Sequence, residues 1–311
     1  MKAKVSGTKK KINGTTFLLM ITILLFVVMY AAGMIVFNDK GFAKPQMFLN
    51  LFISNAGLLV IAMGETIVMI TAGIDISVGS VTALVCMVAA NQMENHGASA
   101  YTALLMALVI GLLFGLVQGF LVSYLEIQPF IVSLAGMFFG RGMTSIISTD
   151  MISIKNKTFL AWANYKIYLP IGSYSRRGKF IPAYIYPTVI IAILIFIVVL
   201  DGLLAGCGGF LFCLNSCSGF VEQAKGLEMD AISASVIGGT LLSGGVGTPF
   251  GTVFGVLIKG TISSLITTQG TLSSWWVRIA LSALLCFFIV LRALSCMTSV
   301  TCRCLFVFFL K

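Results

Sequence analysis

Charged residues are scarce in this chain. They make up 10% of its 311 residues, with only ten aspartates and glutamates and a single histidine, whereas a typical soluble domain carries about 25% charged residues. The low charge argues against a soluble domain, and one histidine cannot form a histidine cluster for a metal site or an intramembrane enzyme. The sequence also lacks the Gly-x-x-x-x-Gly-Lys-Ser/Thr loop that cradles nucleotide phosphates. We therefore expect no catalytic residue, no metal and no cofactor in the chain itself.

Apolar residues dominate instead. They account for 59% of the chain, and the mean hydropathy is +1.05. Because runs of about 20 apolar residues span a bilayer, we expect an all-α polytopic membrane protein with about ten transmembrane helices, some of them short or broken. The expected spans are 17–37, 50–72, 77–90, 101–124, 130–147, 184–200, 202–220, 231–245, 249–267 and 275–294.

The basic residues lie at the ends and in the loops of the chain. The net charge of +10 is therefore interpreted as a means of orienting the protein against the membrane potential and anionic headgroups, and not as a nucleic-acid surface. Five lysines precede residue 17, which predicts a cytoplasmic basic N-terminus over 1–16. A transmembrane domain over 17–294 and an atypical C-terminal tail over 295–311 complete the expected organisation.

One long polar loop gives conflicting topological signals. Residues 148–183 carry six basic residues against the single acid Asp150. Counting five spans from a cytoplasmic N-terminus places this loop outside, whereas the positive-inside rule places it inside. We favour the span count, although a re-entrant hairpin at Asp75 would reverse the parity.

A run near residue 70 ends one apolar segment and begins another. Residues 64–80 are interrupted at Gly73 and continue from Asp75 and Ser77 into a second apolar stretch. Asp and Ser are strong helix N-caps because their oxygens accept the first free backbone N–H groups, which cannot stay unpaired in lipid. The run predicts two membrane helices joined by a capped break.

Glycines recur at helical spacing in two other segments. Small residues four positions apart allow the backbones of membrane helices to approach closely, so we interpret these glycines as packing residues. They are Gly111, Gly115 and Gly119, and then Gly247, Gly251 and Gly255.

Three motifs follow one another along the chain. The first is Gly-Ile-Asp-Ile-Ser-Val-Gly-Ser over 73–80, the second is Pro-Phe-Ile-Val-Ser-Leu over 129–134, and the third lies within 227–252. In this order they resemble the permease subunits of bacterial sugar ATP-binding-cassette (ABC) importers of the ribose/galactose class, over residues 17 to about 292. The motif residues are Gly73, Gly79, Pro129, Phe130, Gly238, Gly239, Gly244 and Gly245.

The resemblance implies an ABC importer permease fold in the bacterial inner membrane. It also implies three partners, namely a cytoplasmic ATPase that binds the ATP, a second permease subunit and an external sugar-binding protein. Two stretches, 134–139 and 270–276, are most similar to the second permease of galactofuranose importers. The cargo implied is galactofuranose or a related hexose or pentose.

The chain also departs from this family. Residues 187–220 form an almost wholly apolar stretch with one charge, Asp201, where members of the family have a cytoplasmic loop of a few dozen residues thought to contact the ATPase. The tail after Arg292 is unlike theirs as well. A permease whose coupling to the ATPase is lost is therefore an alternative to a working importer.

Four polar residues are candidates for the substrate path. Glu65 stands where the family usually has Met, and it either lines the path or serves as a structural partner for another buried polar group. Asp75 and Ser77 lie in the first motif, where a capping role is the alternative. Arg141 is costly to bury in a membrane and is interpreted either as a path residue or as half of an ion pair. An ion-coupled secondary transporter would need a relay of acids in both halves of the chain, which is not evident here.

Overall fold

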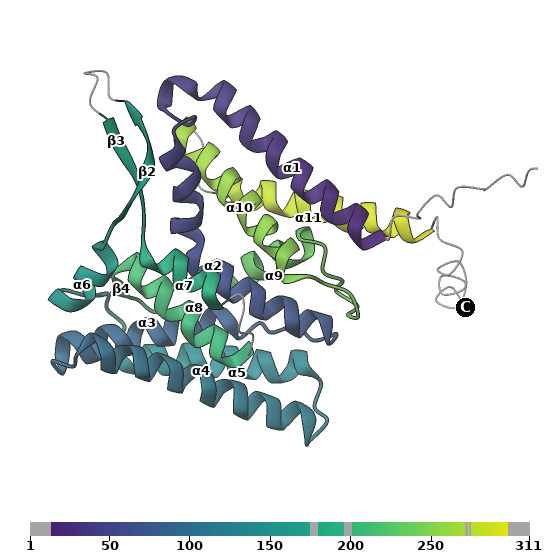
Figure 1. Ribbon diagram of the computed structural model, residues 1–311. Coiled ribbons are helices and arrows are strands. Elements are labelled where there is room, and N and C mark those ends of the chain that lie inside the picture. The colour runs from purple at the N-terminus through teal and green to yellow at the C-terminus, as the bar shows by residue number, and fades with distance from the viewer. Residues whose placement is uncertain (1–13, 175–179, 196–200, 271–272, 274, 298–311) are drawn as a thin grey trace, which may run out of the picture.

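Eleven α-helices and four short strands make up the part of the chain that the computed structural model describes, residues 14–174, 180–195, 201–270, 273 and 275–297 (Figure 1). The helices are α1 (Gly14–Val36), α2 (Pro45–Ile70), α3 (Val78–Asn95), α4 (Ala100–Ser123), α5 (Pro129–Ile147), α6 (Lys157–Asn164), α7 (Pro187–Ile195), α8 (Asp201–Ser216), α9 (Leu227–Ile237), α10 (Pro249–Gln269) and α11 (Trp275–Met297). The strands are β1 (Ile152–Ser153), β2 (Ile167–Tyr174), β3 (Phe180–Ile185) and β4 (Ser218–Gly219), and a 3₁₀ turn, η1, covers Asn38–Lys40.

The expected all-α membrane class is confirmed, and every expected span contains a helix. Five helices are long and apolar enough to cross a membrane, namely α1, α2, α4, α5 and α10. The eleven residues of α9 make a helix of only about 16 Å, compared with a hydrocarbon core of about 30 Å. The expected span over 231–245 is therefore wrong in its second half, because α9 ends at Ile237 and a glycine-rich loop follows.

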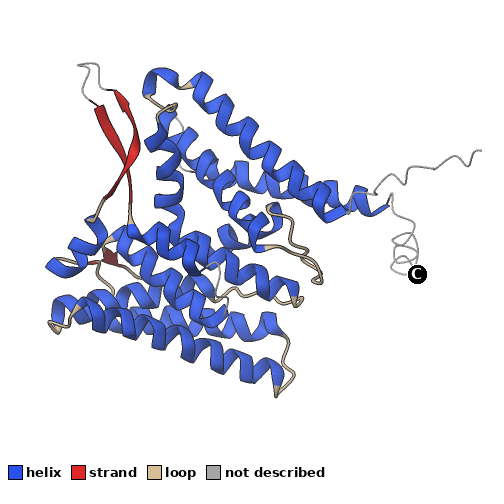
Figure 2. Cartoon of the chain, in the orientation of Figure 1, coloured by secondary structure: helices blue, strands red, loops and turns tan. Residues whose placement is uncertain are grey.

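The long polar loop contains structure that the sequence did not predict. Strands β2 and β3 form an antiparallel hairpin, and β1 pairs with β4, which follows α8 (Figure 2). The side-chain amide of Gln46, at the start of α2, bonds the backbone of Tyr184 through both its nitrogen and its oxygen, at 3.1 and 2.8 Å. The hairpin is thus anchored at its base to α2.

Proline and hydroxyl residues set several helix starts. Pro45, Pro129 and Pro249 each stand at the first helical position, where a missing N–H costs nothing. Thr248 caps α10 by accepting the N–H of Gly251 at 3.2 Å. These local signals place the starts of α2, α5 and α10 at positions that are legible in the sequence.

The helices run alternately between two faces. Thr66 of α2 contacts Thr252 at the start of α10, and Asn55 packs beside Gly260 further along it, so α2 and α10 are antiparallel. In Figure 1 the start of α1 and the end of α11 lie at the right, whereas α6 and the β2–β3 hairpin lie at the left. The polar loop is therefore opposite the start of α1, as the span count requires, and its exposure outside the cell stays a prediction.

Helices α7 and α8 run antiparallel. The start of α7 and the end of α8 line the same small cavity of about 120 Å³. Gly206 packs against Ala107 and Gly111, which are near the middle of α4. Asp201, the first residue of α8, is five residues or about 7.5 Å from Gly206 along the axis of α8. Helix α4 continues for about 18 Å beyond Gly111. The start of α8 is therefore within the depth of the membrane.

Three features expected from the sequence fall largely outside the described residues. The basic segment over 1–16 is described only from residue 14, and the atypical tail over 295–311 only as far as Met297. The junction at Leu200, where the family's cytoplasmic loop is missing, is also outside them.

Candidate translocation path

The break between α2 and α3 lies where the sequence predicted it, but the predicted side-chain cap is absent. Helix α2 ends at Ile70 and α3 begins at Val78. The Oδ1 atom of Asp75 accepts both the N–H of Ser77, at 2.8 Å, and its hydroxyl, at 2.6 Å. Ser77 stands at the N-cap position but makes no side-chain cap bond, because its hydroxyl is donated to Asp75. Asp75 thus forms a turn onto Ser77 just before the helix, and no side chain caps the first turn of α3.

Glu65 supports this break from within the protein. Its side chain is only 1% exposed, and its Oε1 accepts the N–H of Asp75 at 3.3 Å. A buried carboxylate at membrane depth needs such donors. Glu65 is therefore buried against the break and away from any open surface, and its place in the substrate path stays a prediction.

Asp75 and Ser77 border a cavity of about 250 Å³ between the break and helices α4 and α5. The amide of Gln118 donates to the Ser77 hydroxyl at 2.9 Å, and the hydroxyl of Ser133 donates to the carbonyl of Ile74 at 3.1 Å. We call this space the break cavity. It borders the first sequence motif, and its polar side chains lie among a larger number of apolar and glycine residues.

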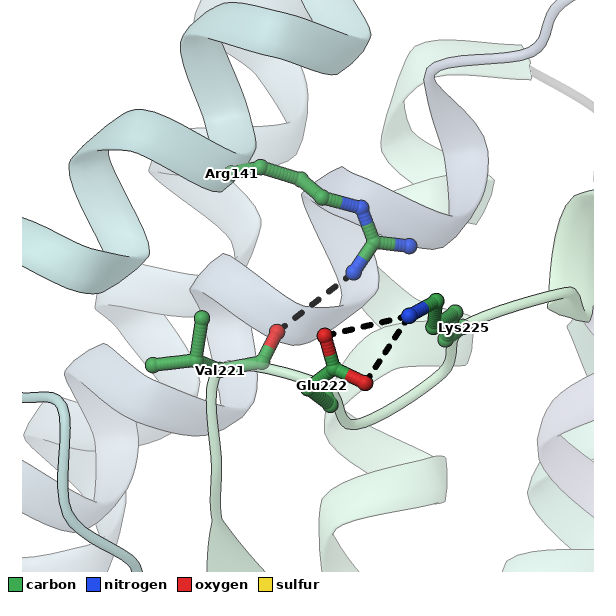
Figure 3. A network of polar contacts seen from close by, with 4 residues as sticks. All are labelled: Arg141, Val221, Glu222 and Lys225. Carbon is green, nitrogen blue, oxygen red and sulfur yellow. Dashed lines mark hydrogen bonds and ion pairs between the residues drawn. The ribbon is translucent and has the colours of Figure 1, made fainter.

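Arg141 takes part in a different polar group (Figure 3). Its Nη1 donates to the carbonyl of Val221 at 3.4 Å, in the segment that joins β4 to α9. The next residue, Glu222, forms an ion pair with Lys225 at 2.9 Å, and their side chains are 58% and 62% exposed. We call Arg141, Glu222 and Lys225 the charged strip.

The charged strip lies at membrane depth. Helix α5 has 19 residues, or about 28 Å, and Arg141 is about 4.5 Å from its midpoint. A second marker is the 3.2 Å ion pair between Asp230, in the first turn of α9, and Lys259, near the middle of α10. Exposed charges at this depth cannot face lipid without a large cost. The strip must therefore face water or another protein.

The motif glycines mostly serve close packing. A Cβ at Gly238 would clash with the backbone of Gly251, and one at Gly255 would meet the carbonyl of Ala234. These contacts bring α9 against α10, as the spacing predicted. At the end of α2, Gly244 lies against Ala72 and Gly247 against Ile70. Gly239 and Gly245 have positive φ angles of 103° and 81°, so they are needed for the turn.

Other motif residues lie around the break cavity. Gly73 contacts Pro129 there, and a Cβ at Gly79 would run into the carboxylate of Glu228. Phe130, 43% exposed, follows Pro129 on the outer surface of α5. The α4 glycines all border the cavity, and Gly111 also packs against Gly206 of α8. Gly119 is exposed and has no atom within 4 Å of an added Cβ, so no other described helix packs against it, and its expected packing role stays a prediction.

Sequence reasoning missed Glu222, Lys225 and Gln118. The first two fall between two expected spans and were interpreted as a loop. Nothing in residues 221–230 distinguishes them from an ordinary loop between two spans. Among the described residues, no group of three or more His, Cys, Asp or Glu side chains could hold a metal ion.

Comparison with known proteins identifies the class to which this fold and these motifs belong. A family model described as "Branched-chain amino acid transport system / permease component" matches residues 47–200 and 190–290. The chain belongs to this family of membrane permeases, and it is a multi-pass protein of the inner membrane. No solved structure matches it.

Several curated relatives are similar over most of their length. The inner membrane ABC transporter permease protein YjfF of Escherichia coli (strain K12) is 37% identical over 303 residues, covering 88% of this chain and 91% of the relative. The fructose import permease protein FruF of Bifidobacterium longum (strain NCC 2705) is 35% identical over 267 residues, covering 75% and 73%. The autoinducer 2 import system permease protein LsrC of Yersinia pestis (strain Pestoides F) is 29% identical over 265 residues, covering 76% and 74%.

The alignments also bear on the missing loop. The alignment with YjfF is 303 positions long, but it includes only 88% of the 311 residues of this chain, which is about 274 residues. About 29 positions of the alignment therefore have no counterpart in this chain. The two segments matched by the family model overlap at 190–200. Both observations agree with a loop of a few dozen residues absent near Leu200.

Proposed function

We propose that this chain is the permease subunit of an ATP-driven importer for a monosaccharide, and that the charged strip forms one wall of the sugar path. The observation that carries the proposal is the exposure of Glu222 and Lys225 at membrane depth. A second permease facing the strip would enclose a water-filled path between the two subunits and remove the charges from lipid.

The strip suits a polyhydroxyl cargo. Sugar hydroxyls both donate and accept hydrogen bonds, and Arg141, Glu222 and Lys225 offer charged partners of both kinds. Towards the start of α11, Trp275 is 67% exposed, and the guanidinium of Arg278 lies 5.4 Å from the centre of its ring and close to Gly226. An exposed indole offers a flat apolar surface to a sugar ring, so this corner is proposed as the entrance to the path.

The energy for import comes from outside this chain. The sequence has no phosphate-binding loop, so ATP would be bound by a cytoplasmic ATPase, and an external binding protein would deliver the sugar. Galactofuranose is the particular cargo that we propose, from the likeness of 134–139 and 270–276 to the second permease of such importers. The name of the family makes branched-chain amino acids the competing cargo.

Uptake by a reconstituted importer tests this proposal. The chain would be assembled in liposomes with the second permease, ATPase and binding protein encoded beside it, and uptake of D-galactose, D-fructose, D-ribose and L-leucine measured with and without ATP. We expect ATP-dependent uptake of a sugar, at least tenfold lower in Arg141→Ala and unchanged in Lys157→Ala, an exposed residue of α6. Uptake of leucine alone, or uptake driven by an ion gradient without ATP, would contradict the proposal.

A second candidate function is a permease that no longer couples to the ATPase. It is favoured by the start of α8 within the membrane and by the stretch of about 29 positions without a counterpart. Co-purification with the ATPase decides between the two. If the ATPase binds only after a relative's loop is inserted following Leu200, the chain is uncoupled, whereas binding to the unmodified chain supports the working importer.

A further inference from the structure

The break cavity is distinct from the charged strip. It is lined by the α2–α3 connection, by one face of α4 and by the first turn of α5. Neither Glu222 nor Lys225 borders it, and Arg141 does not either. The first sequence motif therefore borders a space that combines polar and apolar lining, apart from the charged strip that a second permease would cover.

The polar groups of the cavity suit a neutral, hydroxyl-rich molecule. Both bonds from Ser77 go to Oδ1 of Asp75, so Oδ2 is left to accept a hydrogen bond from an occupant. Gln118 uses its amide nitrogen on Ser77, which leaves the amide oxygen as an acceptor. Ser133 and Thr71 add hydroxyl groups at the rim.

The same lining argues against an anionic occupant. None of the residues that border the cavity, all of them within the described part of the chain, is basic, whereas Asp75 is acidic. Phosphates and carboxylates would therefore meet a carboxylate with no cation to balance it. An acyl chain would find a better place in the neighbouring groove of about 530 Å³, whose lining is apolar apart from Gln118.

Glycines create the space. Gly115 and Gly119 replace side chains along the α4 wall, and Gly73 does so at the break. Gly119 is exposed at the edge of the cavity, and an added Cβ there meets no atom within 4 Å, so a larger side chain has room to occupy the opening. The cavity of about 250 Å³ is below the range of about 300–1,000 Å³ typical for drug-sized ligands, and it therefore suits a single sugar ring.

We infer that the break cavity is a binding site for one neutral monosaccharide within this subunit, with Asp75 and Gln118 as its polar anchors. The inference rests on the proposed function for the choice of a sugar. It assigns Gly119 and Gln118 a role in binding, and it gives the first motif a second task besides forming the turn before α3.

Equilibrium binding tests the site without the other subunits. The full chain would be placed in nanodiscs of E. coli lipid, and binding of radiolabelled D-galactose, D-fructose and D-ribose measured. We expect at least one of these sugars to bind saturably to the wild type. In Asp75→Asn its affinity should be lower by about tenfold or more, because a hydrogen bond to a charged group is replaced by one to a neutral group. Gly119→Leu should abolish binding by filling the cavity.

Gly142→Leu is the matched control. Gly142 is also a helical glycine with no atom within 4 Å of an added Cβ, but it is on α5 and does not border the cavity. Wild-type binding in Gly142→Leu together with loss in Gly119→Leu supports the site. Equal binding in Gly119→Leu and the wild type overturns it, even if Asp75→Asn fails to fold.

Three other results would also overturn the inference. They are the absence of saturable binding for all three sugars, loss of binding in Arg141→Ala with retention in Asp75→Asn, and binding of ²²Na⁺ in place of sugar. Import by the assembled transporter without binding to this chain would remove the cavity site and leave the proposed function intact. Sugar binding to this chain without any import by the assembled transporter would support the cavity site and contradict the proposed function.

Discussion

Two interruptions of the helical structure lie next to each other in this protein, and they differ in how their polar groups are paired. At the α2–α3 break, backbone N–H groups are satisfied internally, because Asp75 accepts from Ser77 and Glu65 accepts from Asp75. In the segment between β4 and α9, Glu222 and Lys225 pair with each other on an exposed surface. The backbone of the first interruption is paired within the chain, and only side-chain acceptors beside the break cavity are left to an occupant, whereas the second lies on an exposed surface that needs water or a partner subunit.

The two regions meet at one point. Gly79, in the first turn of α3, lies against the carboxylate of Glu228 and the carbonyl of Ala224. Helices α3 and α9 thus begin side by side within the membrane. A change at Gly79 should disturb both interruptions at once, whereas changes elsewhere should separate them.

The largest effect is expected from Gly79→Leu. Any side chain here must displace a buried carboxylate and a backbone carbonyl, and overpacking costs typically about 1–3 kcal/mol and at times more. We expect a loss of more than about 3 kcal/mol, seen as a low yield of monodisperse protein and a strongly reduced Tm in detergent. Gly142→Leu, at an open position, serves as the control, and equal stability of the two variants would show that the contact is not restrictive.

The next largest effect should come from Asp75→Ala. This substitution leaves the N–H and hydroxyl of Ser77 without their acceptor, and a lost hydrogen bond to a charged group costs about 1.5–3 kcal/mol. Asp75→Asn retains an acceptor oxygen and should lose less than half as much. Denaturant unfolding in detergent measures both, and an Ala variant as stable as the wild type would mean that the break is held by packing alone.

Breaking the pair between Asp230 and Lys259 should have an intermediate effect. The side chains are 30% and 19% exposed, so the cost of Lys259→Met should be on the order of 1–2 kcal/mol, below the about 3–5 kcal/mol of a fully buried pair. The exchange Asp230→Lys with Lys259→Asp should recover part of it. Denaturant unfolding in detergent measures both variants. If the exchanged protein regains none of the lost stability, packing of the aliphatic part of Lys259, and not the ion pair, is the main contribution.

The α2–α3 break could be predicted from the sequence, whereas the exposed segment between β4 and α9 could not. Gly73 and Asp75 are strong local signals for a break, so the end of α2 and the start of α3 could be predicted. The place of Glu222 depends on α9 being only eleven residues long and on its packing against α10 through Gly251 and Gly255. Those are tertiary contacts, which hydropathy cannot reveal.

The candidate site divides in the same way. Asp75, Ser77 and Arg141 were named from the sequence because charged or motif residues inside apolar runs are conspicuous. Their separation into two places, the break cavity and the charged strip, follows from the direction in which α5 and α3 present their side chains. Gln118 gave no signal beyond being a polar residue within an apolar helix, and only its bond to Ser77 reveals its position.

The smallest stability effect and the sharpest functional one are expected together in Lys225→Ala. The ion pair with Glu222 is exposed, and such pairs contribute little to folding because solvent screens them. We therefore expect an unchanged Tm in detergent, in contrast to Asp75→Ala. Uptake by the assembled importer should nevertheless fall severalfold, because Glu222 would face the path without its counter-ion. The double variant Glu222→Ala with Lys225→Ala keeps the net charge of the strip at its wild-type value of +1 and should import better than Lys225→Ala. If Lys225→Ala lowers Tm as much as Asp75→Ala while leaving uptake intact, both interruptions are structural, and the path lies elsewhere on this subunit.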